Sequence, residues 1–322
     1  MKWHRVLVAA GAALMLAATA HAVVTPVFFY KWGVAGGGPG QFQFPTGVAI
    51  APSGDVYVVD QLNYRVQVFD TNGNFLNQFG TPGNGDGQFF NPTGLGIDPS
   101  GNVYVADTGN QRVQKFTSAG VFITKWGSVG TGNGQFRSPF DVAVGTTGDV
   151  YVTDGQNGRV QHFTSTGTYI SQFGQADLIN TPRGIAINSN GIYVADYGDD
   201  GIIVYDAGTE SSINFWGGNG GANGRFSGPQ GVNLDIQGNV YTAEVNNRRV
   251  QIFDQDGNFL TKFGTSGSND GEFVALRDAC PDNGMDPKVF CADSNNQRIQ
   301  VFGDPATPTG NVTWGRLKAL YK

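Results

Sequence analysis

The sequence has 322 residues, with 49 glycines, 12% aromatic residues and a formal net charge of −6. This acidic balance disfavours nucleic acid as a partner, because nucleic-acid binding calls for clustered lysine and arginine. The aromatic residues recur in register along the chain, so we interpret the glycines as turn residues of a folded domain and exclude general disorder.

The first 22 residues differ from the rest of the chain. Lys2, His4 and Arg5 are followed by an apolar run over residues 6–18 and by Ala20-His21-Ala22. This order is typical of a secretory signal peptide, with cleavage before Val23. The apolar run is too short to cross a membrane, and no later run is longer. We therefore expect a secreted or periplasmic protein whose mature chain has no membrane span; an uncleaved N-terminal anchor is the alternative.

From there on, a segment of four short apolar runs recurs. Its first copy comprises residues 47–50, 56–59, 65–69 and 75–80, bounded by Gly, Asn, Asp and Ser. Such runs predict strands, so we expect each copy to form a four-stranded antiparallel meander. The first turn of each copy carries a glycine for which we expect a positive φ; these are Gly54, Gly101, Gly148, Gly191, Gly238 and Gly284.

An acidic residue marks the same position of every copy. The series is Asp60, Asp107, Asp154, Asp196, Glu244 and Asp293, at steps of 47, 47, 42, 48 and 49 residues. A near-constant period of this length indicates a repeat architecture, and four strands per copy favour radial stacking. We predict an all-β fold, a monomeric six-bladed β-propeller of four-stranded antiparallel blades over residues 23–315, with a tail over residues 316–322.

The two ends of the propeller both resemble the last strand of a repeat. Residues 27–33 and 311–314 match that strand, which gives seven blade-ending strands for six copies. One terminal strand should therefore join the blade formed by the other terminus, because such pairing closes the ring and removes an open edge. The sequence leaves open which of the two segments takes the outermost place.

The residue pattern of the repeat resembles that of a known family. The pattern F-x-x-P-x-G-(V/I)-A…G-x-(V/I)-Y-V-x-D-x-x-N-x-R-(V/I)-Q-x-F occurs at Phe42 to Phe69, Phe89 to Phe116 and Phe136 to Phe163, and in weaker form three more times. It resembles the NHL repeat. The resemblance implies a six-bladed propeller, here of a secreted bacterial type. NHL propellers include enzymes, RNA binders and protein-binding scaffolds, so the resemblance specifies fold more than function.

Two sets of polar residues recur, and we interpret them differently. An arginine follows the acidic residue in most copies, with Ile202 interrupting the series. We interpret these pairs as a structural network of charge-assisted hydrogen bonds, a ligand ring being the alternative. The pairs are Asp60 and Arg65, Asp107 and Arg112, Asp154 and Arg159, Glu244 and Arg249, and Asp293 and Arg298.

The second set precedes each innermost strand. It is regular in spacing but varied in chemistry, which suits a ligand site at the mouth of the central channel. This mouth lies on the Gly-loop face, which carries the Gly-rich loops between successive copies, such as residues 36–40 and 217–224. A channel filled only with water is the alternative. The set is Thr46, Thr93, Phe140, Arg183, Gln230 and Arg277, with Asp141 and Asp278 replacing glycine at the next position.

Cysteine and metal chemistry are sparse. Cys280 and Cys291 fall on neighbouring strands of the last copy, and we predict a disulfide between them in an exported protein. Two cysteines without a nearby histidine do not make a zinc site. A calcium loop starting at Asp254 would need glutamate where Thr265 stands. We expect no cofactor and no metal, a divalent cation being the alternative.

The functional expectation follows from these sets. His162 is the one histidine outside residues 1–22, and it stands in a strand, so we assign no catalytic residue. We expect a non-catalytic scaffold that binds a protein, peptide or glycan through the Gly-loop face. The rival, implied by the NHL resemblance, is a lyase or lactonase acting at the channel mouth, similar to peptidyl-hydroxyglycine lyases or gluconolactonases. Those lyases hold a metal with several histidines, which this chain lacks.

Overall fold

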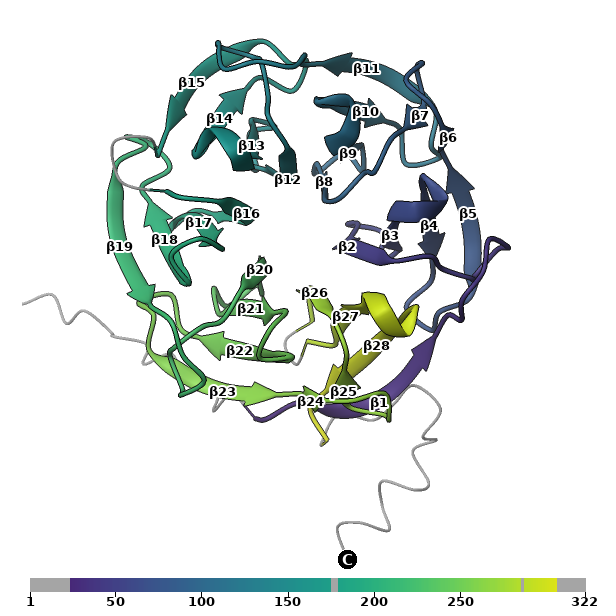
Figure 1. Ribbon diagram of the computed structural model, residues 1–322, viewed down its shortest axis with the longest axis vertical. Helices are drawn as coiled ribbons and strands as arrows, with labels where there is room; N and C mark the ends of the chain where they lie inside the picture. Colours follow the sequence, from purple (N-terminus) through teal and green to yellow (C-terminus); the bar gives the residue numbers. More distant parts are fainter. Residues whose placement is uncertain (1–23, 175–178, 285–286, 306–322) are drawn as a thin grey trace, which may run out of the picture.

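The structure is a computed structural model, and it describes residues 24–174, 179–284 and 287–305. Six four-stranded antiparallel sheets are arranged around a central axis, with β2, β8, β12, β16, β20 and β26 innermost (Figure 1). The prediction of an all-β, six-bladed propeller is therefore confirmed. The expected signal peptide, the terminal segment 311–314 and the expected tail lie outside the described residues. No helix in the part of the chain that the structure describes is long and apolar enough to span a bilayer.

The blades follow one another in chain order. Blade 1 is β2 (Pro45–Ile50), β3 (Val56–Asp60), β4 (Arg65–Phe69) and β5 (Phe75–Phe79), and blade 2 is β8 (Leu95–Ile97), β9 (Val103–Asp107), β10 (Arg112–Phe116) and β11 (Phe122–Trp126). Blade 3 is β12 (Pro139–Val144), β13 (Val150–Asp154), β14 (Arg159–Phe163) and β15 (Tyr169–Phe173). Blade 4 is β16 (Pro182–Asn188), β17 (Gly191–Asp196), β18 (Gly201–Tyr205) and β19 (Ser212–Gly217).

The last two blades complete the ring. Blade 5 is β20 (Pro229–Leu234), β21 (Val240–Glu244), β22 (Arg249–Phe253) and β23 (Phe259–Phe263), and blade 6 is β26 (Leu276–Pro281), β27 (Val289–Asp293), β28 (Arg298–Gly303) and β1 (Val27–Trp32). Short parallel pairs stand in two connecting loops, β6 (Thr81–Pro82) with β7 (Gln88–Phe89) and β24 (Thr265–Ser266) with β25 (Glu272–Phe273). Single 3₁₀ turns follow the second strand in four blades: η1 (Gln61–Asn63), η2 (Thr108–Asn110), η3 (Gly155–Asn157) and η4 (Ser294–Asn296).

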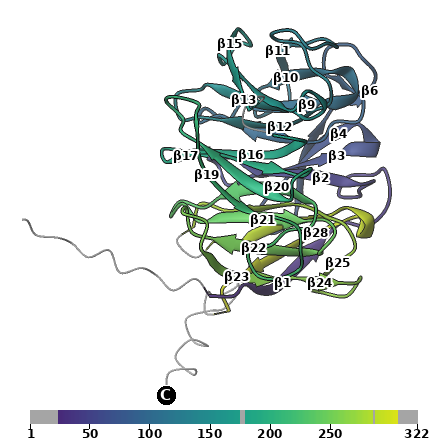
Figure 2. The same cartoon turned by 60° about the vertical axis from the view of Figure 1, so that its left-hand side comes forward.

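The N-terminal strand closes the ring. β1 pairs antiparallel with β28, from Val27 opposite Gly303 to Trp32 opposite Ile299 (Figure 2). The Trp32 ring lies 5.7 Å from Phe69 of blade 1 and 5.9 Å from Phe290 of blade 6, measured between centroids. Residues 27–32 therefore form the outermost strand of blade 6, a point that the sequence left open.

The core consists of six clusters, one at each interface between adjacent blades. The second strand of each blade is buried along its whole length between neighbouring sheets, so its sequence is a nearly continuous apolar run. The predicted turn glycines 54, 101, 148 and 238 have positive φ. Gly191 does not, because β17 begins there.

The predicted cysteine pairing is wrong. Cys280 lies opposite Phe290, whereas Cys291 lies opposite Ala279, so the two cysteines are offset by one residue in the register of β26 and β27. Successive side chains of a strand point to opposite faces of the sheet, so the two sulfurs point away from each other. Cys280 packs in the cluster with blade 1 and Cys291 in the cluster with blade 5. Both are buried free thiols.

The repeated acidic and basic residues pair within each blade. Arg65 Nε lies 2.8 Å from Asp60 Oδ2, and its two Nη groups donate to the carbonyl oxygens of Gly37, Gly38 and Gln41 in the preceding loop. The other four pairs have Nε–O distances between 2.6 and 2.9 Å. The arginine therefore ties the second strand to the Gly-rich loop that enters the blade.

Blade 4 has no arginine at this position, and the residue that takes its place is one position earlier in the chain than expected. Gly201, and not Ile202, lies opposite Asp196 where the other blades have arginine. Asp196 instead accepts hydrogen bonds from the backbone N–H groups of Asn180, Thr181 and Gly198. The connection before blade 4 has only four residues between Gly174 and Ile179, against eight between Gly33 and Phe42, so it needs no arginine to hold a long loop.

Candidate functional site

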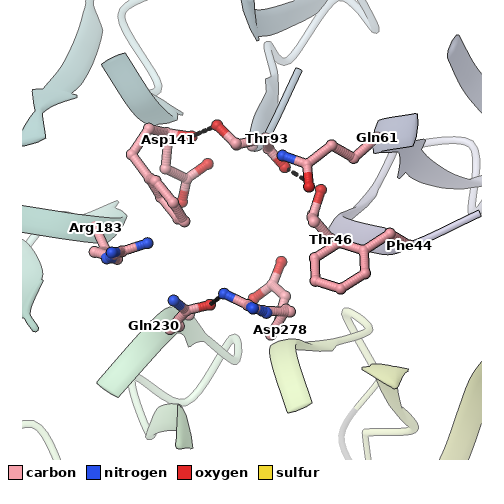
Figure 3. Close-up of a pocket in the computed structure, with 13 residues that line it drawn as sticks. Phe44, Thr46, Gln61, Thr93, Asp141, Arg183, Gln230 and Asp278 are labelled. Atoms are coloured by element: carbon pink, nitrogen blue, oxygen red, sulfur yellow. Dashed lines mark hydrogen bonds between the residues drawn. The ribbon is translucent and has the colours of Figure 1, made fainter. Parts of the chain in front are cut away.

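A cavity of about 180 Å³ occupies one end of the central channel (Figure 3). Gln61, the first residue of the 3₁₀ turn after β3, lies at its wall, so the cavity opens on the face of the Gly-rich loops. All eight residues that the sequence marked for the channel mouth line it. The complete lining is Phe44, Thr46, Gly47, Gln61, Thr93, Gly94, Phe140, Asp141, Arg183, Gln230, Gly231, Arg277 and Asp278.

The innermost strands bring these residues together. Each predicted residue stands within two residues before the start of an innermost strand or among its first three residues, and residues at the start of all six strands line the same cavity. Phe44 and Gln61 were missed, because they stand in loop positions that face the cavity in blade 1 alone. Phe44 has a φ of 65°, an unusual left-handed conformation for an aromatic residue.

Two threonines of the lining are already engaged in holding blades together. Thr46 Oγ1 donates to the carbonyl oxygen of Thr93 at 2.7 Å, and Thr93 Oγ1 donates to the carbonyl oxygen of Phe140. Both side chains are buried. They link blades 1, 2 and 3 around the channel, so their hydroxyl groups already have partners within the protein.

The arginines carry little internal pairing. The Arg183 guanidinium lies 4.7 Å from the Phe140 ring centroid and 4.3 Å from that of Tyr197, so it is held between two aromatic rings. Arg277 lies 5.1 Å from the Phe44 centroid and donates through Nη1 to Gln230 Oε1 at 2.8 Å. Burial lowers the pKa of both guanidinium groups, and the charge of Arg183 lowers that of Arg277 further.

The two aspartates lie on opposite blades of the ring. Asp141 of blade 3 accepts hydrogen bonds from the backbone N–H groups of Val142 and, at 3.1 Å, Ile185 of blade 4. Asp278 of blade 6 accepts from the backbone N–H of Val48 in blade 1 at 2.9 Å and from Asn233 Nδ2 in blade 5 at 2.7 Å. Each carboxyl group therefore links its blade to neighbouring blades.

The buried position of the two aspartates explains why glycine precedes each of them in the ring and why their pKa values are raised. A Cβ atom on Gly94 would lie 2.2 Å from Asp141 Oδ1, and one on Gly231 would lie 2.3 Å from Asp278 Oδ1, so each aspartate needs glycine in the preceding blade. Desolvation raises the pKa of Asp278 to about 7. Desolvation and the nearby charge of Asp278 raise the pKa of Asp141 well above its usual range. Both residues also line a second cavity toward the other end of the channel, so they lie between the two spaces.

This arrangement can hold an anionic group at the mouth and can exchange a proton deeper in the channel. Over the described ranges, no group of three or more His, Cys, Asp or Glu side chains is placed to hold a metal ion.

Comparison with known proteins matches three of the six repeats to a family model. Residues 42–69, 89–116 and 136–163 match the NHL repeat. The chain is 29% identical over 79 residues to the Drosophila melanogaster protein brain tumor, which is 24% of this chain and 8% of that protein. It is 30% identical over 149 residues to a probable peptidyl-alpha-hydroxyglycine alpha-amidating lyase of Caenorhabditis elegans, which is 42% of each chain. The chain thus spans less than half the length of these relatives.

Solved structures share the architecture. A virginiamycin B lyase from Staphylococcus aureus has a TM-score of 0.57 at 12% identity, covering 80% of this chain and 79% of the lyase. A gluconolactonase from Xanthomonas campestris has a TM-score of 0.62 at 15% identity, covering 89% of this chain and 99% of that chain. At these identities the likeness is one of fold. Together with the six sheets and the three repeat matches, it identifies the chain as a six-bladed β-propeller that contains NHL repeats.

Proposed function

We propose that this protein is an exported, non-catalytic binding scaffold that recognises a protein, peptide or glycan through its Gly-loop face, centred on the channel mouth. The observation that carries the proposal is the cavity itself. Six blades contribute chemically different side chains to it, and two of those side chains are arginines with almost no internal hydrogen bonds. A packing position repeated through six blades would be expected to keep one chemistry. Export rests on the composition of residues 1–22.

The surface around the cavity supports the same proposal. The rings of Tyr64 and Phe90 stack with planes 4° apart, and Phe90 is 48% exposed. Both residues stand three positions from cavity-lining residues, Gln61 and Thr93 respectively. Leu62, 43% exposed, lies in the same turn as Gln61. Exposed aromatic side chains beside a polar pocket are typical of binding surfaces.

The test is a capture experiment with a matched control. Immobilised protein is incubated with envelope extract, and the Arg183→Ala/Arg277→Ala double variant is compared with Arg137→Ala, an exposed arginine on the same face but outside the cavity. The captured ligand is then purified and titrated. We expect the double variant to bind it at least about tenfold more weakly, since hydrogen bonds to charged groups contribute about 1.5–3 kcal/mol each. Equal affinity for all three proteins would remove the cavity from the binding site.

A lyase or lactonase acting in the cavity is the second candidate. The specific observation in its favour is the Asp278 carboxyl group, whose raised pKa of about 7 suits proton transfer near neutral pH. The segment similar to an amidating lyase points the same way. Turnover of a peptidyl-hydroxyglycine or a sugar lactone by the purified protein, abolished in Asp278→Asn, would replace the scaffold proposal. Calcium or zinc found by elemental analysis of the active protein would define its cofactor.

A further inference from the structure

We propose that Arg183 and Arg277 form a receptor for a single carboxylate group carried by the ligand. The inference rests on the proposed function in one respect, since it places the ligand in the same cavity. It adds the chemical class of the group that enters.

The first step is the contrast between two kinds of arginine in this chain. Arg65 donates from Nε, Nη1 and Nη2 to Asp60, Gln78 and three carbonyl oxygens. Within the described residues, Arg183 donates no side-chain hydrogen bond, and Arg277 donates one. The Nε atoms of both are buried and have no acceptor in the part of the chain that the structure describes. A buried donor without an acceptor costs about 1–3 kcal/mol. A ligand in the cavity would meet the Nη groups, which are not among the buried unpaired atoms, and those of Arg183 have no acceptor among the described residues.

The second step is that the two guanidinium groups are held for binding and are not collapsed onto an internal partner. The rings of Phe140 and Tyr197 contact the faces of Arg183, and the ring of Phe44 contacts Arg277. Stacking on the face of a planar guanidinium leaves its edge, which carries the N–H donors, free for a ligand. Each side chain is thereby preorganised, which lowers the entropic cost of binding.

The third step concerns charge. The two cations lie close enough that Arg183 lowers the pKa of Arg277, so an anion between them would relieve their repulsion. The aspartates of the cavity do not supply that anion. No ion pair links either of them to either arginine among the residues that the structure describes, and their oxygens accept N–H groups from neighbouring blades instead.

The fourth step selects the anion. Guanidinium edges bind carboxylate and phosphate with similar geometry. Asp278 lies deeper in the same cavity and is ionised above about pH 7, the pH range of the test, so it would repel a dianion there more strongly than a monoanion. The volume of about 180 Å³ is below the range of about 300–1,000 Å³ typical of pockets that enclose a whole small molecule, so only an end group enters. A carboxylate meets both conditions.

Benzoate is a suitable probe, and uncharged benzamide is its matched control. The arginine Nε–H signals of the ¹⁵N-labelled protein are followed by NMR during titration with each compound at constant ionic strength. We expect saturable shifts of two Nε–H signals with benzoate and none with benzamide. Arg183→Gln and Arg277→Gln should each weaken benzoate binding at least about tenfold, whereas Arg137→Gln should leave it unchanged.

Several results would overturn the proposal. They are equal shifts with benzoate and benzamide, an equal loss of affinity in Arg137→Gln, or tighter binding of inorganic phosphate than of benzoate at pH 8. Arg183→Lys guards against misfolding as an explanation, because it keeps the charge but loses the planar donor edge, and we expect affinity between those of the parent and Arg183→Gln.

The outcome is distinguishable from that of the proposed function. If benzoate binds the arginine pair but the double variant still captures the envelope ligand with full affinity, the receptor stands and the placement of the scaffold's binding site at the channel mouth fails. If the envelope ligand depends on both arginines but benzoate does not bind, the scaffold stands and the carboxylate assignment fails.

Discussion

Single buried charges in this chain contribute to stability according to how completely they are paired. Asp107 is fully buried and accepts hydrogen bonds from Arg112, Asn110, Gln114 and the backbone N–H of Phe90. Such a carboxylate tolerates burial only because a cation and three further donors compensate its lost hydration. The arginine in turn needs the loop carbonyl groups for its remaining N–H donors.

Replacing that arginine should therefore be severe. Arg112→Ala leaves Asp107 buried without a counter-ion and releases the loop at Asn84 to Gln88. We expect the free energy of unfolding in urea to fall by about 3–5 kcal/mol, the usual result of breaking a buried pair. Arg137→Ala removes an exposed arginine and should change it by less than about 0.5 kcal/mol. Similar losses in the two variants would mean that the pair does not stabilise the blade.

The channel aspartates predict that the stability of the fold decreases as the pH rises. The folded state raises the pKa of Asp278 from 3.8 to about 7 and that of Asp141 in the same direction. The protonated forms are therefore favoured on folding, and their stabilisation is complete below about pH 4 and is lost as pH rises toward 7. We expect the free energy of unfolding to fall by about 1–3 kcal/mol between pH 5 and pH 8.

The variant Asp278→Asn isolates this effect. It removes the titrating group and the charge that faces Asp141, so the slope of stability against pH between 5 and 8 should become shallower. The measurement is urea unfolding at several pH values for both proteins. A parent protein whose stability rises over this range, or a variant with the same slope, would contradict the assignment.

At the scale of elements, contacts between blades depend on glycine in the outer hairpins. Gly73 in blade 1 has a φ of 84°, and a Cβ there would lie 2.7 Å from Trp32 on the outer strand of blade 6. Gly120, Gly167 and Gly257 meet Phe79, Trp126 and Trp216 in the same way. The hairpin of one blade thus packs directly on the outer aromatic residue of the blade before it.

Gly54 provides a matched comparison, because its φ is 92° but nothing lies within 4 Å of the Cβ position. Gly54→Ala should cost only the left-handed backbone conformation, about 1–2 kcal/mol. Gly73→Ala adds overpacking against the Trp32 ring, about 1–3 kcal/mol more. Thermal unfolding of the two variants measures the difference. Equal losses would show that the Trp32 contact adjusts at no cost.

The secondary-structure elements could be predicted because they repeat. Strand order, turn positions and the acidic positions follow from the period, because each copy packs in the same way. The wrong cysteine prediction shows what the period does not determine. Cys280 and Cys291 were placed on the correct neighbouring strands, but a disulfide depends on side-chain facing, which a register offset of one residue reverses. Blade 4 shows the same sensitivity, with Gly201 and not Ile202 at the arginine position.

For the whole molecule, the channel mouth was predictable and its details were not. Counting positions from each innermost strand found eight of the thirteen lining residues, because the ring brings equivalent positions together. Phe44 and Gln61 could not be found in this way, since they line the cavity from one blade alone. The electrostatic coupling of Asp141 to Asp278 is a property of the closed ring, in which blades 3 and 6 face each other across the axis.

The last prediction concerns the contribution of β1 to the stability of the closed ring. Deleting residues 24–32 removes β1, exposes the edge of β28 and takes Trp32 away from Phe69 and Phe290. Loss of a packed Trp side chain alone costs about 3–5 kcal/mol, and the lost strand pairing adds to this. We expect the midpoint of thermal unfolding to fall by about 10 °C or more. Amide hydrogen exchange should accelerate first in β28, which loses its partner strand, and in β4, which carries Phe69.

A synthetic peptide of residues 24–32 should bind the truncated protein as an added strand and restore much of the lost stability. The same peptide with Trp32→Ala should restore less, because strand pairing would return without the aromatic contacts across the junction. An unchanged unfolding midpoint after the deletion would mean that blades 6 and 1 hold together through their shared core cluster alone. Rescue by both peptides to the same degree would assign closure to backbone pairing and not to Trp32.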